Sequence, residues 1–167
     1  MKKLIALFAA IVLVSGFTTV SAQVTAIATG SATIITPIAI SKTTDMNFGN
    51  VAVSATAGTV VLTPASTRSL TGGVTLPAVT GTVTAAAFAV TGLGSSTYSI
   101  TLPTTYTITS GGNNMIVNAF TSTPSGTGAL TSGAQTVQVG ATLNVGATQA
   151  AGTYTNGTGF NVTVNYN

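Results

Sequence analysis

Side chains that could do acid–base or nucleophilic chemistry are scarce in this sequence. Its 167 residues include four Lys and Arg, one Asp or Glu, and neither His nor Cys. Asp45 therefore has no second carboxylate for acid–base catalysis, a Ser-His-Asp triad has no base, and zinc has no nitrogen or sulfur ligands. Lys42 remains as a base for a Ser-Lys or Thr-based nucleophile, but no pattern places a serine beside it.

The spacing of Lys42 and Asp45 instead indicates an exposed local ion pair beside a turn, which adds little stability. We therefore predict that the protein is not an enzyme and has no catalytic residue, no cofactor and no metal site.

The N-terminal residues have the three parts of a secretory signal peptide. Lys2 and Lys3 form a positive segment, residues 4–14 are apolar, and Val20-Ser21-Ala22 ends in small residues. The apolar run is too short to span a bilayer. We expect a signal peptide over residues 1–22, cleavage before Gln23, and a location that is extracellular, at the cell surface or in the periplasm.

After that cleavage the charged side chains would be Lys42, Asp45 and Arg68 alone. Such a chain has no basic patch, so we expect no nucleic acid partner and no membrane span in the mature protein. A surface near zero net charge has little repulsion against its own copies. That favours self-assembly, or assembly with other surface-structure subunits; the sequence names no small-molecule ligand.

Alternating apolar residues predict β-structure along the remaining chain. Turn signals rich in Gly, Asn, Pro and Ser separate the expected strands. These features predict an all-β, immunoglobulin-like antiparallel β-sandwich of about seven to nine strands, without disulfides, over residues 32–167. The strands that we expect are 31–41, 59–62, 87–92, 98–102, 106–109, 114–120 and 135–145. In the first of them Pro37 indicates an edge strand or a bulge.

The last eight residues also alternate, and we predict that they are structural. Phe160, Val162, Val164 and Tyr166 share one face, and Asn and Thr residues occupy the other. Such a strand either completes its own sandwich or lies at an open edge, which makes these four residues the candidate assembly strand.

A short N-terminal extension, residues 23–31, is the second candidate assembly element. Val24, Ala26 and Ala28 lie on one face of an extended chain, and Ile27 lies on the other. In a polymer of such subunits, this donor segment would pair with a neighbouring copy through backbone hydrogen bonds.

Three stretches carry a resemblance to a known family. They are residues 45–76, which include Asn47-Phe48-Gly49-Asn50-Val51, residues 143–155, which include Gly152-Thr153-Tyr154, and residues 160–167. In this order they resemble the domain of unknown function 4402 family, a group of small exported bacterial β-proteins. The resemblance runs from about Ala32 to Asn167 and implies a fold but no biochemistry.

A looser similarity is to chaperone–usher pilins and spore-coat-like subunits, which share the upstream Gly-x-Tyr and a penultimate tyrosine, here Tyr166. This chain departs from many such pilins because it lacks a disulfide. We expect an exported, non-enzymatic structural or surface protein, such as a pilin-like or coat subunit of an extracellular assembly. The alternative is a monomeric secreted binding module for carbohydrate or another surface ligand.

Overall fold

The computed structural model describes residues 22–167, so the predicted signal peptide lies almost entirely outside the described residues. The described chain has two parts. Residues 22–34 belong to one unit; they are extended and exposed and form no strand. The second unit, Ile35–Asn167, holds all the strands. No helix among the described residues has the length and apolar character needed to cross a membrane.

The second unit is entirely β, and its strands pair antiparallel. This confirms the expected all-β antiparallel sandwich class. Three of the twelve described strands have only two or three residues (β2, β5 and β10), which leaves nine longer ones. The strands are β1 (Ala39–Thr44), β2 (Asn47–Phe48), β3 (Gly58–Leu62), β4 (Arg68–Gly72), β5 (Val83–Thr84), β6 (Ala86–Thr91), β7 (Thr97–Thr101), β8 (Thr105–Ser110), β9 (Asn113–Thr123), β10 (Thr127–Ala129), β11 (Ala134–Val145) and β12 (Thr163–Tyr166).

Strand β11 organises the larger sheet. Its first half pairs with β6 and its second half with β3, while β9 pairs along its other edge and carries β8. The change of partner falls at Gly140, where an added Cβ would overlap the carbonyl oxygen of Leu62. A glycine is needed there because the two backbones approach too closely for a side chain.

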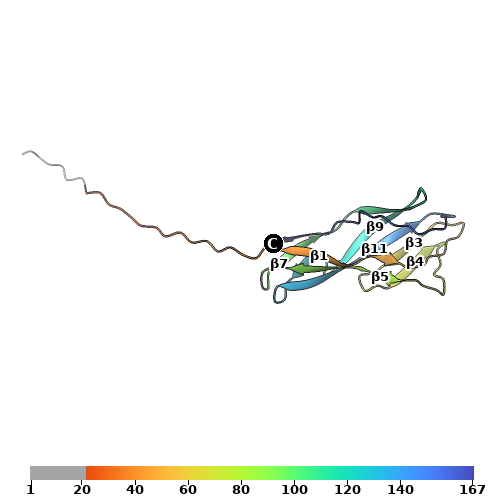
Figure 1. Cartoon of the computed structure of the whole chain (residues 1–167), viewed down its shortest axis with the longest axis horizontal. Helices are drawn as coiled ribbons and strands as arrows, with labels where there is room; N and C mark the ends of the chain where they lie inside the picture. Colours follow the sequence, from red (N-terminus) through yellow and green to blue (C-terminus); the bar gives the residue numbers. More distant parts are fainter. Residues whose placement is uncertain (1–21) are drawn as a thin grey trace, which may run out of the picture. The chain divides into compact units, whose positions relative to one another are not determined.

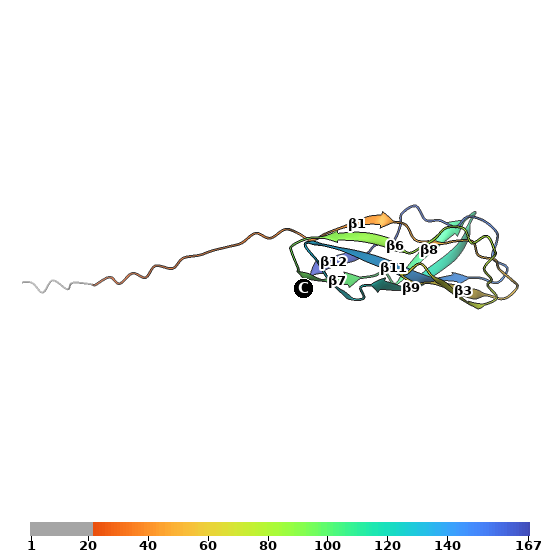
Figure 2. The same cartoon turned by 90° about the horizontal axis from the view of Figure 1, so that it is seen from below.

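Two apolar clusters fill the space between the layers. At one end of this unit, β1, β6 and β11 lie over the smaller sheet β10-β7-β12 (Figure 2). The first cluster lies between them and includes Val90, Tyr98 and Val137. At the other end, near β3 and β4 (Figure 1), the second cluster includes Leu62 and Leu143. Met46 and Phe120 pack against both clusters and so join them.

The first predicted strand begins later than expected. Residues 31–37 are exposed and form no ladder, and β1 starts at Ala39, just past Pro37. Proline lacks the backbone N–H that a ladder requires, so the alternation of residues 31–37 does not become pairing. From Ala39 on, β1 is an edge strand of the larger sheet, as Pro37 predicted.

Candidate functional site

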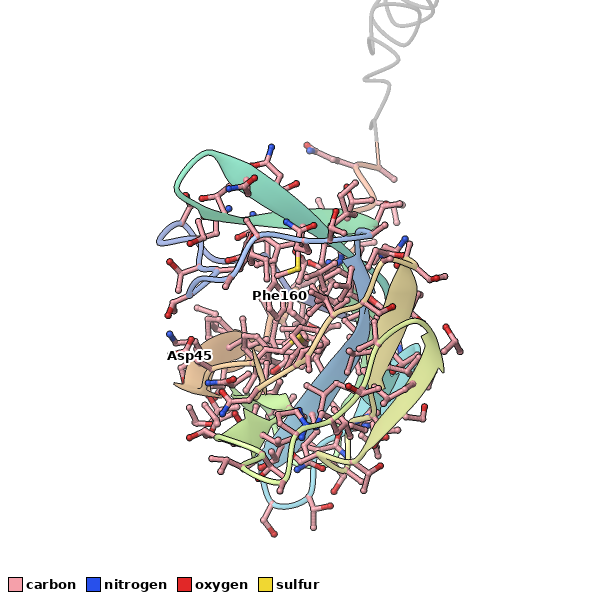
Figure 3. The ribbon with its side chains drawn as sticks, turned by 90° about the vertical axis from the view of Figure 1, so that its right-hand side faces the viewer. Asp45 and Phe160 are labelled. Carbon is pink, nitrogen blue, oxygen red and sulfur yellow. The ribbon has the colours of Figure 1, made fainter. Side chains whose placement is uncertain are left out.

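A cleft opens on the side of the second unit between two segments that are distant in sequence. Its volume is about 1060 Å³. Residues 44–53 form one wall and residues 149–160 form the other. Figure 3 looks at this side of the molecule, with Asp45 at the rim and Phe160 deeper among the side chains.

The first wall is held in place from the side of β5 and β4. Strand β2 pairs with β5, and the Asn50 amide donates to the Thr80 carbonyl at 2.7 Å. The Arg68 guanidinium on β4 donates from one nitrogen to the carbonyls of Phe48, at 2.6 Å, and Asn50, at 3.0 Å. Arg68 is half-buried, and its guanidinium connects β4 to the first wall by these hydrogen bonds.

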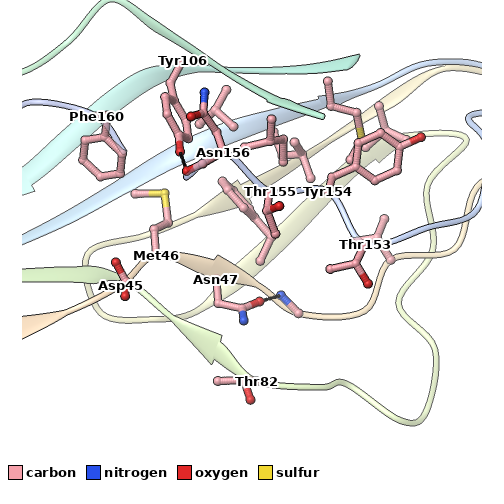
Figure 4. Close-up of a pocket in the computed structure, with 18 of the residues that line it drawn as sticks. Asp45, Met46, Asn47, Thr82, Tyr106, Thr153, Tyr154, Thr155, Asn156 and Phe160 are labelled. Carbon is pink, nitrogen blue, oxygen red and sulfur yellow. Dashed lines mark hydrogen bonds between the residues drawn. The ribbon is translucent and has the colours of Figure 1, made fainter. Parts of the chain in front are cut away.

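The turn at Gly49 shapes the same wall. Gly49 has a φ of +70°, and its amide donates to the Asn47 side-chain oxygen at 2.8 Å. Backbone in this left-handed region favours glycine, and an Asn two residues earlier closes the local turn. This bond is drawn in Figure 4 at the lower edge of the cleft.

The second wall is tied to strand β8. Thr155 exchanges two backbone hydrogen bonds with Thr109, at 2.9 and 3.0 Å. The Asn156 side chain donates to the Thr107 carbonyl at 2.7 Å, and the Tyr106 hydroxyl donates to the Asn156 carbonyl at 2.9 Å (Figure 4). These bonds hold the second wall against β8.

Aromatic and aliphatic side chains form the floor of the cleft. Phe160 packs edge-on against Tyr106 at a centroid distance of 5.5 Å and against Phe88 at 6.3 Å, and it lies 5.1 Å from Phe120. Met46 extends between the two walls (Figure 4). The floor is therefore preformed by the core of the domain, so its own side chains would lose little conformational entropy when an apolar partner binds.

The cleft carries almost no net charge. Lys42 donates to Asp45 at 2.5 Å, and both side chains are mostly exposed. This pair is the predicted exposed ion pair. Burial raises the pKa of the Tyr106 hydroxyl, and the nearby Asp45 carboxylate raises it further. Tyr106 is therefore a neutral hydrogen-bond donor. Among the described residues, no three His, Cys, Asp or Glu side chains lie close enough together to hold a metal ion.

The four predicted C-terminal residues occupy different places on one face. Phe160 lines the cleft, whereas Val162, Val164 and Tyr166 continue along the first apolar cluster. Val164 is buried, and the alternation with exposed Asn and Thr residues holds over residues 160–167. The Tyr166 hydroxyl accepts from the Leu93 amide at 2.6 Å and donates to the Thr36 carbonyl at 2.8 Å. Their part in assembly stays a prediction.

The four predicted donor residues lie in the other unit. Val24, Ala26, Ile27 and Ala28 are all exposed, and Val24 and Ile27 are 91% and 96% exposed. No strand of the described chain includes them. Their donor role also stays a prediction.

Sequence reasoning missed the cleft itself. Its walls are two of the stretches that carried the family resemblance, residues 45–53 and 149–155, and Phe160 begins the third. The sequence therefore contained the motifs that form the cleft, since Asn-Phe-Gly-Asn and Gly-Thr-Tyr lie on opposite walls. What the sequence lacked was the pairing that brings residues about 100 positions apart to one opening.

Comparison with known families identifies the family of this chain. The model of a family described as a domain of unknown function, DUF4402, matches residues 38–166. The chain belongs to this family. The match spans every described strand and both walls of the cleft, so the cleft is part of the DUF4402 domain. No curated protein and no solved structure matches the chain.

Proposed function

We propose that this DUF4402 protein is an exported, non-enzymatic structural protein, a pilin-like or coat subunit of an extracellular or cell-surface assembly. The observation that carries the proposal is the neutral cleft with an apolar floor and two polypeptide walls. Such a surface suits another protein better than a charged metabolite, because it offers apolar contact and backbone hydrogen bonds but little charge.

Two further features support assembly. The domain keeps three charged side chains, so copies repel one another weakly at neutral pH. In addition, large apolar side chains are exposed on residues 22–35, including Ile34 at 98%. Burial of these side chains by a partner would remove apolar surface from water, which is favourable.

The test combines imaging with solution measurement. Electron microscopy of shed surface material, labelled with an antibody against the chain, should show the antibody on a filament or coat. Sedimentation velocity of the purified chain beginning at Gln23 should show oligomers that grow with concentration. A chain that stays monomeric at high concentration and is missing from surface polymers contradicts the proposal.

A monomeric binding module for carbohydrate or another surface ligand is the second candidate. The cleft favours it in one respect, because the amide side chains of Asn47 and Asn156 and the aromatic rings of Tyr106 and Phe160 line the same cavity. Its volume of about 1060 Å³ lies just above the usual range for small-molecule sites, roughly 300–1,000 Å³. Saturable glycan binding by a strictly monomeric chain would select this candidate over assembly.

A further inference from the structure

The larger sheet of the second unit ends in three strands, β1, β8 and β4. A strand at the end of a sheet presents unpaired backbone N–H and C=O groups, to which another chain can pair. Proteins usually block such an edge with a charged side chain, a proline, a bulge or a covering segment. The three ends of this sheet differ in that protection.

Two of the three ends are blocked. Strand β1 follows Pro37, carries the exposed Lys42, and has a register shift between Lys42 and Thr44. The outer edge of β8 is bridged by Thr155, which exchanges backbone hydrogen bonds with Thr109 at 2.9 and 3.0 Å. A second chain would have to displace these groups before it could extend the sheet at either end.

Strand β4 has none of these protections among the described residues. It is Arg68-Ser69-Leu70-Thr71-Gly72, in which Ser69, Thr71 and Gly72 are exposed. Its charged side chain, Arg68, donates to the carbonyls of the first cleft wall. In the described chain β4 pairs with β3 alone. The edge that faces away from β3 is therefore open to another strand.

The pairing with β3 shows which backbone groups of β4 are free. In an antiparallel pair, positions that exchange hydrogen bonds alternate with positions that do not. The Gly73 amide donates to the Ala57 carbonyl at 3.1 Å just past one end of β4, and the Thr63 amide donates to the Thr67 carbonyl at 2.9 Å just before the other. The odd-numbered residues of β4 therefore exchange hydrogen bonds with β3.

The even-numbered residues of β4 consequently turn their N–H and C=O groups away from β3. They are Arg68, Leu70 and Gly72, and no other backbone group within the described residues bonds to them. These positions are symmetric about Leu70, so a second β4 laid antiparallel places Leu70 opposite Leu70 and Arg68 opposite Gly72. Each outward-facing residue then meets another outward-facing residue, which makes the edge complementary to itself.

The side chains of β4 also fit this pairing. Ser69 of each copy would lie opposite Thr71 of the other on the exposed face, where hydroxyl pairs stabilise a sheet. Gly72 has no side chain to obstruct Arg68. The two Arg68 residues would be four positions apart, about 14 Å along the strands, and salt screens exposed charges beyond about 8 Å.

We propose that two copies of this chain pair through their β4 edges, antiparallel about a two-fold axis at Leu70, and so join their larger sheets into one continuous sheet. Such a contact uses the same surface on both copies and closes at a dimer. The dimer would then be the unit from which a larger assembly is built. The inference rests on the proposed function, since it names one contact between the assembling subunits.

Cysteine cross-linking tests the register, because the chain has no cysteine of its own. One chain carries Ser69→Cys and a second carries Thr71→Cys, and their Cα atoms would lie about 4.5 Å apart, within the range of a disulfide. Mixed under mild oxidation, the two chains should form a covalent heterodimer. The Ser69→Cys chain alone should cross-link far less, because its two cysteines would be about 7–8 Å apart.

A third chain, carrying Thr107→Cys, is the control partner for this experiment. Thr107 is exposed on β8, at an end of the sheet that the proposal leaves free. The Ser69→Cys chain should cross-link to it far less than to the Thr71→Cys chain. Equal yields with the two partners, or an equal yield from the Ser69→Cys chain alone, overturn the proposed pairing.

Charge substitutions test the same contact in solution. Ser69→Lys and Thr71→Asp each place two like charges about 7–8 Å apart across the axis, so each variant alone should lose the dimer in sedimentation velocity. A mixture of the two variants sets opposite charges face to face and should regain it. Thr107→Lys is the matched control and should dimerise like the wild type. Circular dichroism should be unchanged throughout, because all three positions are exposed.

The failures of the two proposals can be told apart. If the wild type associates and the Ser69→Lys variant associates equally well, assembly stands and the β4 contact is wrong. If the wild type is monomeric in solution but the antibody labels it on a filament or coat, the β4 contact is again wrong and the proposed function stands. If the wild type cross-links in the expected register but is missing from surface polymers, the contact stands and the proposed function fails.

Discussion

At the scale of single residues, the three charges of the domain play different parts. Lys42 and Asp45 pair at the surface, where solvent screens their attraction. Arg68 instead bridges two carbonyls of the first cleft wall. Sequence alone groups these residues as sparse surface charges, because composition does not show which guanidinium meets a backbone carbonyl. In the folded chain, Arg68 positions the wall that carries β2.

Neutralising Arg68 should therefore destabilise the protein, whereas neutralising Lys42 should not. Hydrogen bonds to charged groups contribute about 1.5–3 kcal/mol, so Arg68→Gln should lower the free energy of unfolding by about 1–3 kcal/mol. Lys42→Gln is the matched control and should change it by about 0–1 kcal/mol. Urea denaturation followed by circular dichroism measures both. Equal effects of the two substitutions would mean that the bridge of Arg68 is not stabilising.

At the scale of elements, period-two alternation predicted the long strands well. The expected strands 98–102, 106–109 and 135–145 correspond to β7, β8 and β11 within one or two residues. A strand with one face toward the core and one toward solvent alternates apolar and polar residues, so its sequence predicts it directly. Strand β4 was missed because it is an edge strand of mostly Ser, Thr and Gly, and β2 and β5 are too short to show a period.

The candidate site was less predictable than the strands. The sequence identified Phe160 and the motifs of both walls, but it assigned Phe160 to a terminal strand and the motifs to a family. Long-range pairing decides that residues 44–53 face residues 149–160, and a single sequence carries no record of that pairing. The start of β1 was wrong for a local reason, since the pattern continues through Pro37 but the ladder does not.

Removal of residues 160–167 should prevent folding. The deletion takes away β12, the buried Val164, and the ring of Phe160 that packs against Phe88 and Tyr106. Large core truncations cost about 2–5 kcal/mol each, against a total stability of roughly 5–15 kcal/mol. Removal of residues 23–30 is the control and should leave the circular dichroism spectrum and the melting temperature unchanged. A C-terminally shortened chain that melts cooperatively near the wild-type temperature would contradict this prediction.

At the scale of the whole molecule, the shortage of ionisable groups should make stability nearly independent of pH over a wide range. The chain has no His, Cys or Glu, so no side chain of these types changes charge between pH 5 and 9. A domain of this kind would keep the same weakly charged surface, and the same tendency to associate, across that range. The ionisation that we expect to change stability is that of tyrosine side chains, at alkaline pH.

Alkaline unfolding is the expected consequence. Burial raises the pKa of Tyr98 and of Tyr106 above the ordinary value of 10.0. The unfolded chain therefore releases these protons first as pH rises, and the folded state binds more protons above about pH 10. Stability is fully present below that pH and is lost as pH rises through the raised pKa values of the folded chain.

Urea denaturation at a series of pH values measures this loss. We expect a flat free energy of unfolding from pH 5 to 9 and a fall beyond pH 10. Tyr106→Phe should start from a lower stability, because Asn156 loses the hydroxyl that donates to its carbonyl at 2.9 Å. The same variant should then lose less stability than the wild type above pH 10, because one of the two shifted groups is gone. A steep change between pH 5 and 9, or an identical alkaline fall in wild type and variant, would contradict the assignment of this titration to the buried tyrosines.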